Sequence, residues 1–125
     1  MRKQYTIKGV NFAQGELLLS LDEEISFEKI KATDQMLVDS DAISFIYIIE
    51  LDEEYTYMVL PENVWPDLRR ILIENIPVFL LVDESKIKLP NIHNELHYLI
   101  ENIKGNKNYG EEMVQKVESA FLSIS

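Results

Sequence analysis

The segment from residue 43 to residue 51 constrains the fold most, because it is apolar at nearly every position. Its odd positions, from Ile43 to Leu51, are all apolar or aromatic, and its even positions include Ile46 and Ile48. A strand that is apolar on both faces is typical of the centre of a sheet that is covered on both sides. The segment therefore predicts a sheet around which the other elements have to pack.

The residues that follow this segment predict a hairpin. The acidic triplet at 52–54 supplies the turn, and residues 55–60 continue an alternating pattern that ends at Pro61. A three-residue loop would pair Leu51 with Tyr55 and place the odd residues of both strands on one aromatic and β-branched face. The triplet lacks the Gly or Asn that such loops prefer, so the register stays open at this point.

The first third of the chain predicts a second hairpin. Residues 4–12 alternate, but the apolar parity changes at Gly9, where a β-bulge would fit. A turn then leads into a strand at 16–21. Before the central segment, Ser26 is expected to cap a short helical turn, and residues 35–38 form a short apolar strand.

The middle of the chain alternates between helix and strand. Asn63 is positioned to cap a helix over roughly 64–75, in which Pro66 is tolerated only within the first turn. Residues 78–82 predict a buried strand, and residues 85–89 predict a short edge strand that its lysines protect. The chain thus returns to the sheet after one helix.

The last third predicts two helices. Asn91 is expected to cap the first, in which apolar residues recur at helical spacing from Ile92 to Ile103, and Gly105 takes the left-handed position after its end. Residues 113–121 carry a second apolar stripe. The short loop between the helices predicts an antiparallel pair.

Strands that are joined mostly by hairpins and followed by helices indicate an α+β fold. We expect a mainly antiparallel sheet packed against about three helices, the last two being the C-terminal antiparallel pair. The chain has 125 residues, of which 46% are hydrophobic and 27% are charged. These values are ordinary for globular proteins and predict a single domain over residues 1–125.

Composition narrows the classes of function. The chain has no cysteine, which excludes disulfides, thiolate metal sites and cysteine nucleophiles. Its net charge is -10 and its basic residues are scattered, so nucleic acid and anionic membranes would be repelled. No apolar run reaches the length of a signal peptide or a membrane span. We therefore expect a cytoplasmic protein that binds neither nucleic acid nor membrane.

Acidic residues flank the central segment and raise the question of a cation site. Asp39 and Asp41 are two residues apart, but they lack the glycine and the distant glutamate of a calcium loop. Asp and Ser favour turns because their side chains bond nearby backbone amides. The interpretation as a turn is therefore preferred, and the same holds for the triplet at 52–54.

One spacing in the chain resembles a set of metal ligands. His93, His97 and Glu101 follow one another at intervals of four residues, so they share one face of a helix and could present two imidazoles and a carboxylate to zinc. No HExxH motif accompanies them. Polar residues that flank an apolar stripe are more often simply solvated, and a surface face is the preferred interpretation.

Four aromatic residues form the other candidate site. They could line a groove or an interface, where aromatic side chains are favoured, although they are more often part of a core: Tyr47, Tyr55, Tyr57 and Trp65. No nucleophile elbow and no phosphate-binding loop are present in the sequence. No catalytic residue and no cofactor are predicted.

Three stretches carry a resemblance to a known family. They are QMLVDSD at 35–41, the hairpin followed by ENVW at 62–65, and HNELHYLIENIKGNKNYG at 93–110. Together they resemble the YjbL-like family (UPF0738) of Gram-positive bacteria, from about residue 34 to the end of the chain. The resemblance implies a stand-alone cytosolic bacterial protein and brings with it no activity, cofactor, partner or site residue.

Three hypotheses follow for the function. The first is a non-enzymatic binding or regulatory protein that meets another protein, or a second copy of itself, through an aromatic sheet face or an exposed edge. The second is a small-ligand or metal-binding protein that uses His93, His97 and Glu101. An enzyme that uses carboxylates such as Asp39 and Asp41 ranks last, because no catalytic constellation is visible.

Overall fold

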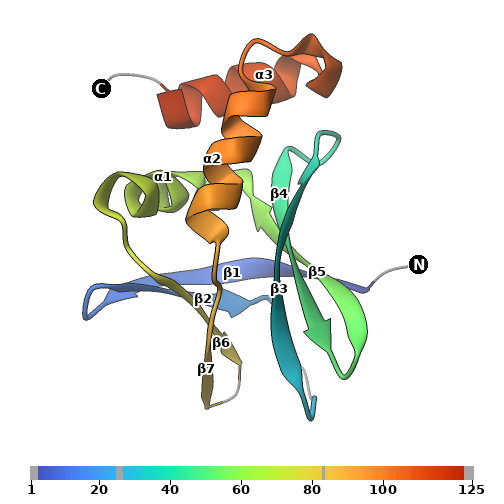
Figure 1. The fold of residues 1–125 in the computed structure, drawn as a ribbon, viewed down its shortest axis with the longest axis vertical. Helices are drawn as coiled ribbons and strands as arrows, with labels where there is room; N and C mark the ends of the chain where they lie inside the picture. Colours follow the sequence, from blue (N-terminus) through green and yellow to red (C-terminus); the bar gives the residue numbers. More distant parts are fainter. Residues whose placement is uncertain (1–2, 25–26, 83, 123–125) are drawn as a thin grey trace.

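The computed structural model describes residues 3–24, 27–82 and 84–122. Over these residues the chain forms a seven-stranded sheet in the order β3-β4-β5-β1-β2-β6-β7 and three α-helices (Figure 1). The strands are β1 (Lys3–Ala13), β2 (Glu16–Leu21), β3 (Ile30–Asp39), β4 (Ser44–Leu51), β5 (Glu54–Pro61), β6 (Val78–Val82) and β7 (Ser85–Lys88). The helices are α1 (Trp65–Glu74), α2 (Ile92–Ile103) and α3 (Glu111–Val117), with shorter helical turns at η1 (Glu62–Val64), η2 (Lys107–Tyr109) and η3 (Glu118–Leu122). The predicted α+β class with a mostly antiparallel sheet is confirmed.

Strand β1 joins the two halves of the sheet. Its residues 3–6 pair with β5 in parallel, and its residues from Ile7 onward pair with β2 in the antiparallel direction. The β1–β2 register shifts between Ile7 and Gly9, which confirms the predicted bulge. A Cβ atom at Gly9 would lie 3.1 Å from the Cβ atom of Ser20, a tight contact that glycine avoids where the two strands approach closely.

The β1–β2 hairpin closes as predicted, through a two-residue loop. Gln14 and Gly15 both have positive φ, at 54° and 77°, which is the geometry of a type I′ turn. Strand β6 then pairs with β2 in parallel, and β7 forms the edge of the sheet, as its lysines predicted. Local sequence patterns carry no signal for the two parallel pairings, since each joins strands that are distant in the chain.

The helical turn predicted after the first hairpin is not observed. Ser26 lies outside the described residues, while residues 27–29 are not helical and β3 already begins at Ile30. The reason is a contact from the β4–β5 turn: the Asp52 carboxylate accepts hydrogen bonds from the backbone N–H groups of Glu28 at 2.8 Å and Lys29 at 2.7 Å. These bonds hold the segment in a non-helical path that bends at Glu28, and β3, which begins at Ile30, is longer than the predicted strand at 35–38.

The loop between β4 and β5 is one residue shorter than predicted. Leu51 pairs with Glu54, so the loop consists of Asp52 and Glu53, whose φ values are 50° and 71°. The predicted pairing of Leu51 with Tyr55 is therefore wrong. A type I′ turn matches the twist of the flanking strands, and this advantage outweighs the preference of its two positions for Asn and Gly.

Helix α1 begins close to its predicted position, but without the predicted cap. Pro66 lies in the first turn, as expected. Asn63 belongs to η1, and no side chain caps either η1 or α1. The helix ends at Asn75, which has a left-handed φ of 54° and lets the chain turn back toward β6.

Helices α2 and α3 cover the predicted ranges with two differences. Asn91 precedes α2 with a φ of 66° and no side-chain cap bond, so it is a turn residue rather than a cap. Gly105 has a φ of 66° after the helix end, as predicted. The predicted antiparallel pairing is not confirmed, because α3 runs across the end of α2 in Figure 1.

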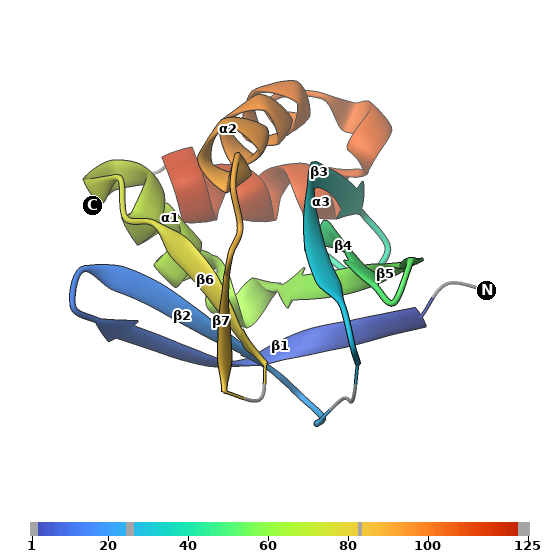
Figure 2. The same ribbon diagram turned by 60° about the horizontal axis from the view of Figure 1, so that its bottom comes forward.

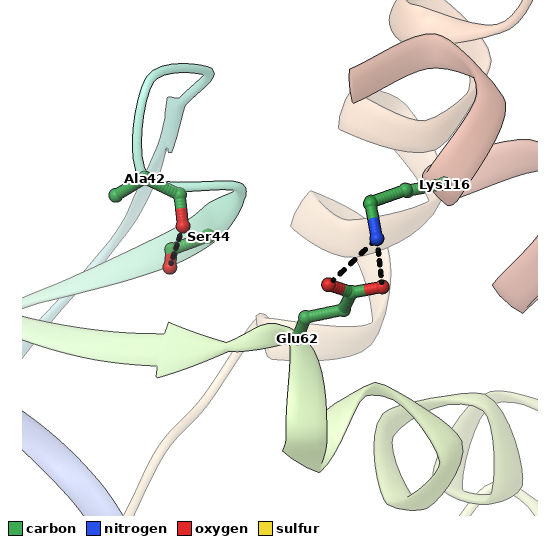
Figure 3. A network of polar contacts seen from close by, with 4 residues as sticks. All are labelled: Ala42, Ser44, Glu62 and Lys116. Carbon is green, nitrogen blue, oxygen red and sulfur yellow. Dashed lines mark hydrogen bonds and ion pairs between the residues drawn. The ribbon is translucent and has the colours of Figure 1, made fainter. Parts of the chain in front are cut away.

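The helices gather on one side of the curled sheet, which is its inner face (Figure 2). The main core cluster lies between them and this face, and its largest members include Trp65, Tyr47 and Phe45. Lys116 on α3 contacts the carboxylate of Glu62 in η1 at 3.1 and 3.2 Å (Figure 3), which connects the last helix to the end of β5.

We predict that Glu53→Gly raises the free energy of unfolding by about 1 kcal/mol. A non-glycine residue costs roughly 1–2 kcal/mol in the left-handed region, and part of this gain is offset by the greater freedom of glycine in the unfolded chain. Urea unfolding would measure the change. Glu53→Gln is the control for loss of the charge, and a Gly variant no more stable than the Gln variant would contradict the prediction.

Candidate functional site

An apolar strip covers the outer face of the sheet, on the side away from the helices. We call this surface the outer strip. Cross-strand pairs define it, because residues directly opposite each other in a ladder point to the same face. Its members are Leu37 on β3, Ile46 and Ile48 on β4, and Tyr55, Tyr57 and Val59 on β5.

The centre of the outer strip is buried although it lies outside the main core cluster. Ile46 is 5% exposed and Val59 is 8% exposed, and neither belongs to the cluster beneath the helices. Leu37 and Tyr55 lie toward the margins and are 39% and 51% exposed. The centre of the strip is therefore packed within the chain itself, and the apolar area that a partner could reach lies at the margins.

A shallow hollow of about 170 Å³ lies at one end of the outer strip. It is lined by Gln35, Ile48, Tyr55 and Tyr57. Two tyrosine rings and an amide offer both apolar area and hydrogen-bonding groups, as interface residues commonly do. The hollow is too small for a drug-sized ligand, but it suits a single side chain of a partner.

Acidic turns close the two ends of the outer strip. The β3–β4 turn carries Asp39 and Asp41, and the β4–β5 turn carries Asp52 and Glu53. Since both turns adjoin β4, they lie at its opposite ends. The candidate surface is therefore apolar along its length and negatively charged at both ends.

Carboxylates of these turns also accept hydrogen bonds from backbone N–H groups. Asp39 accepts a hydrogen bond from the backbone N–H of Ala42 at 3.2 Å, a local side chain–backbone bond that stabilises the turn. In the same turn the hydroxyl of Ser44 donates to the carbonyl of Ala42 at 3.1 Å (Figure 3). This geometry supports the predicted turn at Asp39 and Asp41.

The register of the β4–β5 hairpin divides the predicted aromatic site. A shift of one residue moves every side chain of a strand to the opposite face. Tyr55 and Tyr57 therefore lie on the outer strip, whereas Tyr47 points into the core and is fully buried. The prediction that all three share one face is wrong.

Tyr47 has a structural partner in the core. Its hydroxyl donates to the carbonyl of Pro90 at 2.8 Å, across the gap between β4 and the segment that precedes α2. Burial raises the pKa of Tyr47 well above its usual range, and the nearby carboxylates of Asp34 and Glu95 add to the rise against a lowering contact with the Asp34 backbone. The phenol therefore remains neutral and serves as a hydrogen-bond donor.

Trp65 is also part of the core. Its ring is fully buried and packs against Phe45 and Phe121, with centroids 5.2 and 5.6 Å away, and its indole N–H donates to the carbonyl of Leu60 at 3.2 Å. The apolar ring is packed within the chain, and the indole N–H has its hydrogen-bond acceptor there as well. No part of the ring lines a surface groove.

The histidine face of α2 is divided between two surroundings. The Nε2 atom of His93 lies 2.6 Å from the carbonyl oxygen of Ile76, so this ring is held against the end of α1. His97 and Glu101 line a separate hollow of about 160 Å³ between α1, α2 and η3. Within residues 3–24, 27–82 and 84–122, no three His, Asp or Glu side chains form a group that could hold a metal ion.

Sequence patterns did not identify three members of the outer strip, namely Leu37, Ile46 and Ile48, whereas the alternation already places Val59 on one face with Tyr55 and Tyr57. The signal was available at Ile46 and Ile48, which are apolar even positions of β4 although the odd positions already supply a core face. To place Ile46 and Ile48 on the same face as Tyr55 and Tyr57, one has to know that the loop has two residues, because the loop length sets which β5 residues lie opposite β4.

The architecture defines a class of protein: a curled, mostly antiparallel α+β sheet with helices on one face and an apolar strip on the other. The chain belongs to a family of unknown function, UPF0738, whose model matches residues 5–121. The resemblance stated from the sequence is thereby confirmed.

The relatives are bacterial proteins of similar length. The UPF0738 protein YjbL of Bacillus subtilis (strain 168) and the UPF0738 protein of Bacillus pumilus (strain SAFR-032) are each 41% identical over 122 residues, covering 98% of this chain and 100% of the relative. The UPF0738 protein of Anoxybacillus flavithermus (strain DSM 21510 / WK1) is 47% identical over 98 residues, covering 78% of this chain and 73% of the relative. No solved structure matches this chain significantly. No helix in the described part of the chain is long and apolar enough to cross a membrane.

Tyr47→Phe should weaken the fold at neutral pH by about 1 kcal/mol, because the Pro90 carbonyl would lose its donor inside the protein. The raised pKa adds a pH dependence. Stability from neutral Tyr47 is fully present below pH ~10 and is lost as the pH rises further, since the unfolded tyrosine ionises first. Urea unfolding above pH ~10 should therefore show that the free energy of unfolding falls less steeply with pH in the Phe variant than in the wild type. With the exposed Tyr98→Phe as control, identical pH slopes in the wild type and Tyr47→Phe would contradict the assignment.

Trp65→Ala should lower the free energy of unfolding by about 3–5 kcal/mol, because it leaves a large cavity beside Phe45 and Phe121. Denaturant unfolding measures this loss. Ile73→Ala on the same helix removes an exposed side chain and should change stability by less than ~0.5 kcal/mol. Strong acrylamide quenching of the native wild-type fluorescence would contradict the core position of the ring.

Proposed function

We propose that this chain is a non-enzymatic binding or regulatory protein that acts in the bacterial cytoplasm through contact with another protein. The outer strip makes the contact. The observation that carries the proposal is a sheet face that is apolar and aromatic, opposite a face that three helices already cover. Monomeric proteins seldom leave a continuous apolar surface without a use for it.

The composition of the surface supports this function over catalysis. The strip offers tyrosine and branched aliphatic side chains around one small hollow, and its nearest carboxylates lie in turns. Tyrosine is enriched at interfaces because its ring adds apolar area while its hydroxyl can bond to a partner. Tyr55 and Tyr57 are the two members of the predicted aromatic group that keep this role, since Tyr47 and Trp65 are core residues.

The alternative function, small-ligand or metal binding on α2, has weaker support. Of its three candidate residues, His97 and Glu101 share a hollow, while His93 is held by the carbonyl of Ile76. A site of two ligands binds zinc less tightly than the three or four ligands that proteins normally use. The acidic composition and the bacterial relatives are consistent with the cytoplasmic setting of the preferred proposal.

The double variant Leu37→Ser/Tyr55→Ser should stay folded but no longer bind the partner protein. Both side chains lie at exposed margins of the outer strip, so the core beneath the helices is unaffected. The matched control is Ile73→Ser/Tyr98→Ser, which removes one exposed aliphatic and one exposed aromatic side chain from the helices. Circular dichroism and thermal unfolding would verify that both variants are folded.

The measurement is affinity capture from the native cytoplasm with quantitative mass spectrometry. We expect at least one protein to be retained by the wild type and the helix control, and to fall about tenfold or more with the strip variant, as loss of an interface anchor would cause. Equal retention by the wild type and both variants, or equal loss in both, would contradict the proposal.

A further inference from the structure

We propose that the partner of the outer strip is a basic protein segment, with apolar side chains at its centre and Lys or Arg residues near both ends. This inference rests on the proposed function and adds the chemistry of the partner. It is carried by the placement of two acidic turns at the two ends of one apolar surface.

The distance between the turns sets the length of the segment. β4 spans eight residues, Ser44–Leu51, between the β3–β4 turn and the β4–β5 turn. At roughly 3.3 Å per residue, the two acidic ends are about 26 Å apart. An extended segment of about eight residues between its basic ends would reach both turns at once.

The charges at both ends are accessible. Asp41 and Glu53 are exposed, and they lie at opposite ends of β4. Glu54, next to Glu53, has Lys3 at 4.0 Å, but both of these side chains are largely solvated and the attraction between them is weak. The carboxylates of the turns can therefore attract a basic partner.

The sides of the outer strip add little net charge. Lys31 on β3 lies opposite Glu50 on β4, so these two charges balance each other on the outer face. Tyr55 pairs with Glu50 from the other side. The negative potential is consequently concentrated at the ends of the strip rather than along it.

A second copy of the chain fits this surface poorly. Each copy carries a net charge of -10. A two-fold symmetric contact through β4 would bring the Asp41 turn of one copy near the Glu53 turn of the other, and like charges placed opposite each other oppose association. A basic segment has the complementary charge at both ends, and its apolar side chains can cover the accessible Leu37 and Tyr55.

Three synthetic peptides of about 12 residues would test the inference, since this length spans the strip with its turns. All share a centre of alternating Leu, Val and Thr. The first carries two Lys residues at each end, the second carries two Glu residues at each end, and the third has the four Lys residues moved to the centre. Fluorescence anisotropy with a labelled peptide measures each affinity for the intact protein.

We expect the peptide with Lys at both ends to bind about tenfold or more tightly than either of the others, and to weaken when salt is raised from about 50 to about 300 mM, because screening reduces attraction between exposed charges. Asp41→Lys/Glu53→Lys should weaken this binding by about tenfold. The matched variant Glu74→Lys/Glu112→Lys changes the net charge equally at exposed positions on α1 and α3, and should bind as the wild type does.

The possible failures separate this inference from the proposed function. Equal binding of all three peptides, lost in Leu37→Ser/Tyr55→Ser, would overturn the basic partner and leave the strip as a binding surface. A concentration-dependent dimer in sedimentation equilibrium, lost in the same strip variant, would assign the surface to a second copy and also overturn the inference. Peptide binding that is unchanged in the strip variant would contradict both proposals.

Discussion

The pairing of β1 with two different strands is the constraint on which the rest of the structure depends. Its residues 3–6 belong to a ladder with β5, and its residues from Ile7 onward belong to a ladder with β2, whose register shifts between Ile7 and Gly9. A Cβ atom at Gly9 would make a tight contact with Ser20, which glycine avoids. One strand thus joins two halves of a sheet that curls around a single concave face, which the helices fill.

The edge strands of the curled sheet, β3 and β7, each have a neighbouring strand on one side only, so other contacts have to help hold them in place. Hydrogen bonds to the start of α2 and the segment before it hold β3 and β4: Tyr47 of β4 donates to the Pro90 carbonyl at 2.8 Å, and Glu95 of α2 accepts from the Met36 backbone N–H at 3.2 Å. Asn91 adds a longer bond of 3.4 Å to the carbonyl of Asp34. This requirement explains why the most prominent aromatic residue of the central strand is structural, and why its phenol has to stay neutral.

The outer strip follows from the same geometry. β4 is apolar on both faces, yet the helices cover only the concave one, so Ile46 and Ile48 are packed against β3 and β5 neighbours instead. The acidic residues at the ends of the strip have local partners, such as the amides that bind Asp39 and Asp52. Their positions are therefore explained by turn formation, while their remaining charge shapes the field that a partner would meet.

The sequence by itself determined the features that depend on neighbouring residues: the α+β class, the bulge at Gly9, the first hairpin and the three helices, since periodicity and turn chemistry are local. It also indicated a turn at Asp39 and Asp41. Only the tertiary structure decided the features that depend on distant contacts. The Asp52 carboxylate holds the segment before β3 in a non-helical path where a helical turn was predicted, and the two parallel pairings join strands far apart in the chain. The division of the tyrosines between core and surface depended on one residue of loop length, because a single step in register exchanges the two faces of a strand.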